Sequence, residues 1–194
     1  MESTSNYINQ IELAGAIESI PALKIRKMKD KDVEMLFKIM YWSALRPGEG
    51  IRLKKEDFVL PNRIINLGQT KTKKNDKAVI PRAFIPELEQ YLKDKPDGKL
   101  FNCKYITFYK WLKRLGKING IEAWTTHTSE TGEKTVGHIF RKSVGKDMMF
   151  GEILDMEGNK IDIPVISQHM RHSKPSMTID HYLKATSEQV KNTF

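Results

Sequence analysis

A helical spacing of apolar residues after residue 30 constrains the fold more than any other pattern in the sequence. These residues recur at i, i+3, i+4, i+7 and i+11, as on one face of an amphipathic helix: Val33, Leu36, Phe37, Met40 and Ala44. We expect a helix from Asp30 to Ala44, with Asp30 or Asp32 available as its N-cap. Pro47 ends this pattern, so the preceding Arg46 should lie where the backbone turns and its side chain can be held over a surface.

The pattern changes to short β-type runs between residues 58 and 81. The runs 63–67 and 78–80 are separated by polar residues 73–76, which predicts a β-hairpin with its turn there. Four lysines crowd this hairpin: Lys71, Lys73, Lys74 and Lys77. Such a cluster is also typical of a solvated sheet edge.

Two further helices are predicted in the middle of the chain. Pro86 suits the first turn of a helix that runs to about Leu92. A helix from Tyr105 to Ile118 carries an apolar stripe of Tyr105, Phe108, Leu112 and Leu115 and a cationic stripe of Lys110, Lys113, Arg114 and Lys117. The cationic stripe is either a solvated face or a surface that contacts phosphates.

The last third begins with a helix that carries His138 and Arg141 and buries Ile139, Phe140, Val144 and Met148. A small extra hairpin is expected at about 152–163, turning at Gly158 and Asn159. The fold class is therefore α+β, mainly helical, with a small antiparallel β-sheet near the N-terminal half and this extra hairpin.

The composition of the chain limits the classes of function that it can have. The chain has 194 residues, a net charge of +9 and a pI near 9.5, which favours a polyanionic partner, most commonly nucleic acid, although a membrane surface is an alternative. No apolar run has the length of a bilayer-spanning helix, and no secretory signal is recognisable. The single cysteine, Cys103, suits a reducing cytosol and excludes an intrachain disulfide. We expect no metal site, no cofactor and a cytoplasmic protein.

Two histidines, an arginine and a tyrosine stand at suggestive spacings near the C-terminus. His138 and Arg141 are three residues apart, which on a helix lets an imidazole and a guanidinium address one anion. His172 precedes Tyr182 by ten residues. Taken alone, His138 and Arg141 are better explained as a solvated surface pair, and Tyr182 as a core aromatic.

The whole ordered set resembles the catalytic domain of the tyrosine recombinases, phage and archaeal integrases included. The set is Arg46, Lys71, His138, Arg141, His172 and Tyr182, and the resemblance covers roughly residues 22–194. The segment 44–49, ALRPGE, is similar to the family's box G-L-R-x-x-E, with Ala44 in place of glycine and Glu49 as the acid that supports the arginine. Two other differences are Lys142-Ser143 for His-Thr and Arg171 for the glycine before the histidine.

The resemblance implies a role for each residue. Arg46 and Arg141 would bind the non-bridging phosphate oxygens, His138 would act as base or orienting group, and His172 would donate a hydrogen bond to the phosphate. Tyr182 would be the nucleophile. Lys71, with Lys73 as the rival, would protonate the leaving 5′-oxygen, and DNA-binding contacts are expected from Lys73, Lys74, Lys110, Lys113, Arg114 and Lys117.

The resemblance also implies partners and organisation. Residues 1–22 would form an N-terminal helix and linker and residues 23–194 the catalytic domain, with no separate N-terminal core-binding domain. The partner would be double-stranded DNA at recombination sites, engaged by a homo-oligomer, with no membrane involved. A topoisomerase with the same chemistry and a non-catalytic DNA-binding protein derived from an integrase remain as alternatives.

Overall fold

The computed structural model describes residues 7–69, 75–125, 138–172, 176 and 178. The chain divides into two compact units, residues 1–143 and 144–194. Helices of the first unit are α1 (Gln10–Glu18), α2 (Asp30–Trp42), α3 (Pro47–Arg52), α4 (Ile85–Lys93), α5 (Tyr105–Asn119) and α6 (Glu122–Thr125), joined by the 3-10 helices η1 (Ile20–Leu23), η2 (Lys55–Asp57), η3 (Leu60–Asn62) and η4 (Arg82–Phe84). Helix α7 (Ile139–Phe150) begins in the first unit and ends in the second, which contains α8 (Ile163–His169).

A three-stranded antiparallel sheet in the order β1-β2-β3 is built from β1 (Phe58–Val59), β2 (Ile64–Gln69) and β3 (Asn75–Val79). Ile65 pairs with Phe58 on one side and Ala78 on the other, and Ile65 and Ala78 are both buried. The predicted hairpin is thus confirmed, but Asn75 and Asp76 belong to β3 and not to the turn. The predicted lysines Lys71, Lys73 and Lys74 lie outside the described residues.

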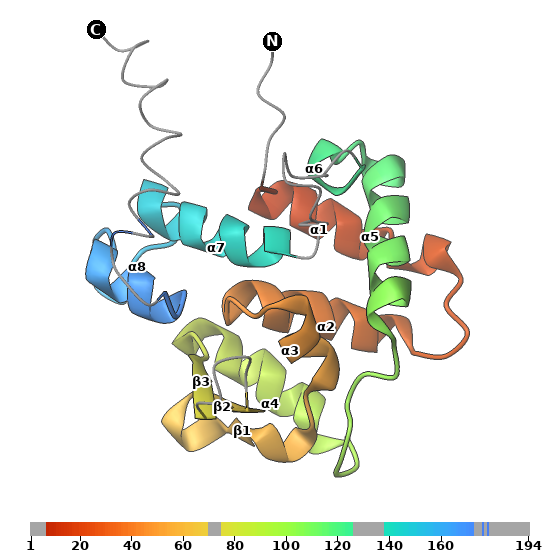
Figure 1. Ribbon diagram of the computed structural model, residues 1–194, viewed down its shortest axis with the longest axis horizontal. Helices are drawn as coiled ribbons and strands as arrows, with labels where there is room; N and C mark the ends of the chain where they lie inside the picture. The colour runs from red at the N-terminus through yellow and green to blue at the C-terminus, as the bar shows by residue number, and fades with distance from the viewer. Residues whose placement is uncertain (1–6, 70–74, 126–137, 173–175, 177, 179–194) are drawn as a thin grey trace, which may run out of the picture. The chain divides into compact units, whose positions relative to one another are not determined.

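Aromatic rings from four helices make the core of the first unit. Phe37 of α2 packs edge-on against Phe108 of α5 at 5.8 Å and Trp124 of α6 at 6.1 Å between ring centroids. Phe140 in the first turn of α7 lies 5.2 Å from Phe37. Figure 1 shows α1 and α6 beside α5, and Gly116 lets α5 and α6 approach because a Cβ there would lie 2.8 Å from the Cβ of Trp124. This cluster fixes the start of α7, where His138 and Arg141 lie.

Helix α2 is the predicted helix, with a different N-terminus. Its N-cap is Lys29, so Asp30 and Asp32 lie in the first turn and the N-cap prediction was wrong. Asp32 instead accepts a hydrogen bond from the Tyr91 hydroxyl of α4 at 3.0 Å and pairs with Lys95. The carboxylate of Asp32 therefore connects α2 to α4.

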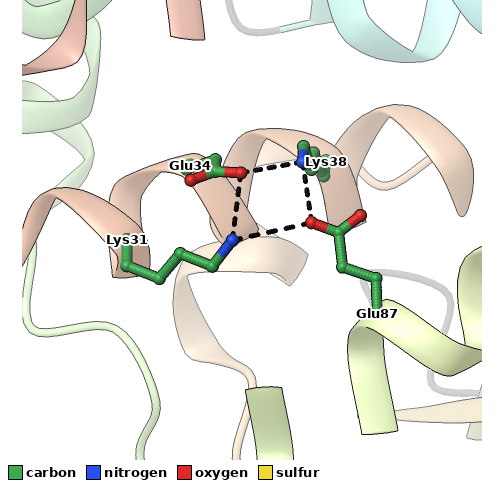
Figure 2. A network of polar contacts seen from close by, with 4 residues as sticks. All are labelled: Lys31, Glu34, Lys38 and Glu87. Atoms are coloured by element: carbon green, nitrogen blue, oxygen red, sulfur yellow. Dashed lines mark hydrogen bonds and ion pairs between the residues drawn. The ribbon is translucent and has the colours of Figure 1, made fainter. Parts of the chain in front are cut away.

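A ring of four charges makes a second link between α2 and α4 (Figure 2). Glu34 pairs with Lys31 at 3.1 Å and Lys38 at 2.7 Å, and Glu87 of α4 pairs with Lys38 at 2.7 Å. Burial alone would raise the pKa of Glu34, but the hydrogen bonds and charges of Lys38 and Lys31 outweigh it and lower that pKa. A contact of 3.6 Å between Lys31 and Glu87 closes the ring, which joins α2 to α4.

Helix α2 ends in a left-handed turn that sets the position of Arg46. Ala44 has φ +49°; its N–H donates to Tyr41 O, and the N–H of Leu45 donates to Met40 O, which together form a Schellman motif. Sequence reasoning placed the helix end near Pro47, whereas α2 ends at Trp42 and Pro47 begins the unpredicted α3. Gly50 lets α3 lie close to α2, because a Cβ there would meet the Met40 side chain at 2.7 Å.

Helix α8 ends in the same way within the second unit. Arg171 has φ +50°; its N–H donates to Gln168 O at 2.9 Å, and the N–H of His172 donates to Ser167 O at 3.0 Å. His172 is thus the first residue beyond the left-handed position of another Schellman motif. The backbone of His172 is fixed by the end of α8.

Other predicted elements are present with small differences. Helices α4 and α5 match the predicted spans, but Tyr105 does not belong to the apolar stripe because 43% of it is exposed. The hairpin expected at about 152–163 consists of one antiparallel bridge, Leu154 to Lys160, with Gly158 at φ +83°. In the described residues no helix is long and apolar enough to cross a membrane.

The left-handed backbone at Ala44 generates a stability prediction. Ala44→Gly should change the free energy of unfolding by less than about 1 kcal/mol, because relief of the left-handed conformation, about 1 kcal/mol, offsets the loss of one buried methyl group, about 0.8 kcal/mol. Ala44→Val should cost more than about 2 kcal/mol, since a β-branched residue disfavours positive φ and the site is fully buried. Urea unfolding midpoints measure both, and a valine variant as stable as the parent would contradict this account.

Candidate functional site

Arg46 is held at the N-terminus of α3 by Glu49. Its backbone N–H donates to Oε2 of Glu49 at 2.7 Å, and its guanidinium donates to Oε1 at 2.9 Å. The Glu49 side chain is 5% exposed and that of Arg46 is 44% exposed. A buried carboxylate therefore anchors a guanidinium that still reaches solvent.

Arg141 comes to the same region from the first turn of α7. Its guanidinium NH1 donates to the carbonyl oxygen of Ala44 at 3.0 Å, in a bond between residues 97 apart in the sequence. Arg141 is only 6% exposed, so this bond lies in a low dielectric where a charged donor needs a partner. The bond ties the start of α7 to the turn that precedes Arg46.

His138 lies immediately before α7, within the field of both arginines. Burial lowers its pKa most, and the charges of Arg46, Arg141 and Lys142 lower it further, while Glu49 raises it. The net effect is a pKa below the usual 6.5, so the imidazole is neutral at neutral pH. The structure thus brings together three predicted residues, Arg46, His138 and Arg141, with Glu49 as support.

Sequence reasoning missed the contribution of two residues to this region. The carbonyl of Ala44 carries no signal in the sequence, because any residue has one. Lys142 had a signal: it follows His138 by four residues, a helical spacing that places two side chains on one face. It is half-buried, and burial lowers its pKa.

Ser143 connects the N-terminal segment to α7. Its hydroxyl donates to Ile139 O at 2.8 Å and accepts the N–H of Ile8 at 2.9 Å, in a buried setting. A hydroxyl is therefore retained where the family carries threonine, and here it links the chain before α1 to the helix that carries Arg141.

In the second unit, His172 is paired with a threonine. Its Nδ1 lies 2.7 Å from Oγ1 of Thr178, and Thr178 is fully buried. Sequence reasoning did not single out Thr178 as a candidate residue. The tyrosine expected as nucleophile, Tyr182, lies outside the described residues, as do Lys71, Lys73 and Lys74.

The predicted cationic stripe lies along α5. Lys110, Arg114 and Lys117 are exposed, whereas Lys113 is half-buried with its Nζ 5.3 Å from the centre of the Tyr109 ring. Arg114 also donates to Leu23 O at 3.4 Å. These cations leave one face of α5 strongly positive.

The cluster of Arg46, His138 and Arg141 has the chemistry of an oxyanion site. Two planar, permanently charged donor groups suit a phosphate or carboxylate, and a neutral imidazole beside them can accept a proton. Among the described residues no three His, Cys, Asp or Glu side chains gather as metal ligands.

Two curated relatives are similar to this chain. A tyrosine recombinase XerA from Saccharolobus solfataricus is 30% identical over 112 residues, 55% of this chain and 38% of the relative. A tyrosine recombinase XerA from Pyrococcus furiosus is 24% identical over 187 residues, 95% of this chain and 59% of the relative. The chain thus spans less than two thirds of the length of either relative.

Solved structures share the fold. The catalytic domain of bacteriophage HP1 integrase superposes with a TM-score of 0.60 at 17% identity, covering 94% of this chain and 93% of that one. A post-cleavage complex of the XerH site-specific recombinase with palindromic difH substrate gives 0.64 at 19% identity, covering 98% and 53%. The predicted α+β fold, that of a tyrosine recombinase catalytic domain, is confirmed. The sequence profile of the phage integrase family matches residues 12–189, nearly the whole chain, and the chain therefore belongs to the phage integrase family.

Proposed function

We propose that this chain is the catalytic part of a site-specific DNA recombinase or integrase. It cleaves and rejoins duplex DNA through a covalent 3′-phosphotyrosine intermediate and requires neither metal nor ATP. The observation that carries the proposal is the convergence of Arg46, His138 and Arg141 from segments far apart in the sequence. The curated relatives are tyrosine recombinases, and XerH is described in complexes with its DNA substrate before and after cleavage.

The proposed reaction exchanges one phosphodiester for another. The phenolic oxygen of Tyr182 attacks the phosphorus, its proton passes to His138, and the bond to the 5′-oxygen breaks. Lys71, or Lys73 in its place, protonates that departing oxygen. Because the phosphate stays esterified to Tyr182, an incoming 5′-hydroxyl can reverse the steps and rejoin a strand without ATP.

The residues of the cluster suit the charges that develop. Negative charge grows on the non-bridging oxygens in the transition state, and Arg46 and Arg141 present fixed guanidinium groups that need no reorganisation. A neutral His138 can accept the proton of a phenol whose usual pKa is about 10. His172 would complete the set as a hydrogen-bond donor to the phosphate.

The partner in this proposal is double-stranded DNA carrying recombination sites. The exposed cations of α5, Lys110, Arg114 and Lys117, with Lys113 beside them, would contact backbone phosphates and position the duplex without reading its sequence. Lys73 and Lys74 would add contacts from the hairpin. Recombination joins two sites, so the protein would act as a homo-oligomer on DNA, in the compartment that holds the DNA.

A covalent-trapping assay tests this function. The protein is incubated with nicked suicide duplexes that carry candidate recombination sites, and denaturing gels are scored for a strand linked to protein. The parent chain should give the adduct in the presence of EDTA, and Tyr182→Phe should reduce it below detection because no phenolic oxygen can attack. Tyr105→Phe, which changes an exposed tyrosine of α5, should leave the adduct yield unchanged.

Each alternative gives a different result. Relaxation of supercoiled plasmid with an adduct but no recombinant product would indicate a topoisomerase. DNA binding that is unchanged in Tyr182→Phe, with no adduct from the parent chain on any substrate, would indicate a non-catalytic binding protein and overturn the proposal.

The pKa of His138 gives a pH prediction. NMR titration should place the His138 midpoint below 6.5, and Arg46→Gln should raise it because one of the lowering charges is removed. Since the unfolded chain binds this proton near pH 6.5 and the folded chain only at lower pH, His138 should make stability fall as the pH drops from about 6.5 to the folded-state pKa. A midpoint at or above 6.5 in the parent chain would contradict a neutral imidazole.

A further inference from the structure

The contact between His172 and Thr178 suggests a role for a residue that the sequence did not single out. Nδ1 of His172 and Oγ1 of Thr178 are 2.7 Å apart, a short distance for a hydrogen bond that involves a ring nitrogen. Thr178 is fully buried and His172 is half-buried. A buried hydroxyl so close to the ring restricts its rotation, since turning the ring would give up the bond.

His172 is therefore constrained in two independent ways. Its backbone is fixed by the Schellman motif that ends α8, through the bond from its N–H to Ser167 O. Its ring is fixed by Thr178. Nε2 lies on the other edge of the imidazole, and it is the nitrogen that the proposed function assigns to the phosphate.

We propose that Thr178 is a positioning residue that orients the His172 ring and keeps a proton on Nε2. This inference rests on the proposed function, in which His172 donates a hydrogen bond to the phosphate. A hydroxyl is suited to the task because it can donate to Nδ1 of the neutral ring and accept from Nδ1–H of the charged ring. In the proposed arrangement the Thr178 hydroxyl donates to Nδ1 of the neutral ring, so that Nε2 carries the proton in both charge states of His172.

The same contact holds a residue that precedes the proposed nucleophile closely in the sequence. Thr178 precedes Tyr182 by four residues in the sequence. The hydrogen bond thus ties the chain at residue 178 to the turn at His172 of the same protomer. Removal of the hydrogen-bond partner that orients a metal-ligating histidine costs about 10- to 100-fold in metal affinity or activity, and we expect an effect of the same order here.

Matched variants of Thr178 separate the hydroxyl from the packing. Thr178→Val has nearly the same shape and lacks the hydroxyl, whereas Thr178→Ser keeps the hydroxyl and lacks the methyl group. We expect the single-turnover rate of adduct formation to fall about 10- to 100-fold in the valine variant, with DNA affinity unchanged, and to stay within about threefold in the serine variant. Equal rates in the valine variant and the parent chain would overturn the inference.

A double-mutant cycle distinguishes positioning of His172 from a general structural role. In a His172→Ala background, Thr178→Val should cause no further loss of rate, because the ring that the hydroxyl orients is gone. Independent, multiplicative losses would show that Thr178 acts through something other than His172 and would overturn the inference.

The tautomer of His172 can be measured in the free protein, so this test of Thr178 does not depend on DNA cleavage. Long-range proton–nitrogen NMR of the His172 ring should show the tautomer with the proton on Nε2 in the parent chain and in Thr178→Ser. Thr178→Val should shift the Nδ1 resonance and populate both tautomers. If the parent chain shows the opposite tautomer, the inference is overturned even if adducts form. If it shows the predicted tautomer but forms no adduct, the inference stands and the result counts against the proposed function.

Discussion

The hydrogen bond from Arg141 to the carbonyl of Ala44 is the interaction on which the rest of the candidate site depends. It joins the first turn of α7 to the turn after α2 at 3.0 Å, within a region where Arg141 is almost fully buried. A buried guanidinium without such a partner is strongly unfavourable. The bond therefore selects a fold in which the His138 and Arg141 segment lies beside Arg46, and the aromatic contacts of Phe37 and Phe140 hold that arrangement from the core side.

Two left-handed helix ends lie just before candidate site residues. Ala44 and Arg171 both take the position beyond the C-cap that glycine usually occupies, at φ +49° and +50°. Each costs about 1 to 2 kcal/mol relative to an ordinary conformation, and each is followed within two residues by a candidate site residue, Arg46 or His172. The left-handed backbone explains why the family usually has glycine at these two positions. This chain adopts the same left-handed backbone with alanine and arginine.

Sequence reasoning succeeded where the signal was periodic or carried by a spaced motif. The stripe from Val33 to Ala44 predicted α2. The H-x-x-R spacing predicted that His138 and Arg141 lie on one face of a helix. The charge of Arg141 does act on His138, but His138 precedes α7, so the shared helical face stays a prediction. Sequence reasoning failed where tertiary contacts decide the structure. Asp32 was predicted as an N-cap, but its carboxylate binds Tyr91 and Lys95 instead. Helix α3 was not predicted because it is too short to show a helical period. The carbonyl of Ala44 and the hydroxyl of Thr178 could not be selected from the sequence, because only the fold brings them to Arg141 and His172.

We propose that Arg46 and Arg141 form one site for one phosphate. The most direct measurement is a crystal structure of the Tyr182→Phe variant bound to an intact duplex that carries its recombination site. The account predicts that both guanidinium groups donate to the non-bridging oxygens of a single phosphate, with Arg141 still bonded to the carbonyl of Ala44 and Arg46 still paired with Glu49. Two arginines on separate phosphates, or an Arg141 that has left Ala44 to reach the DNA, would contradict it.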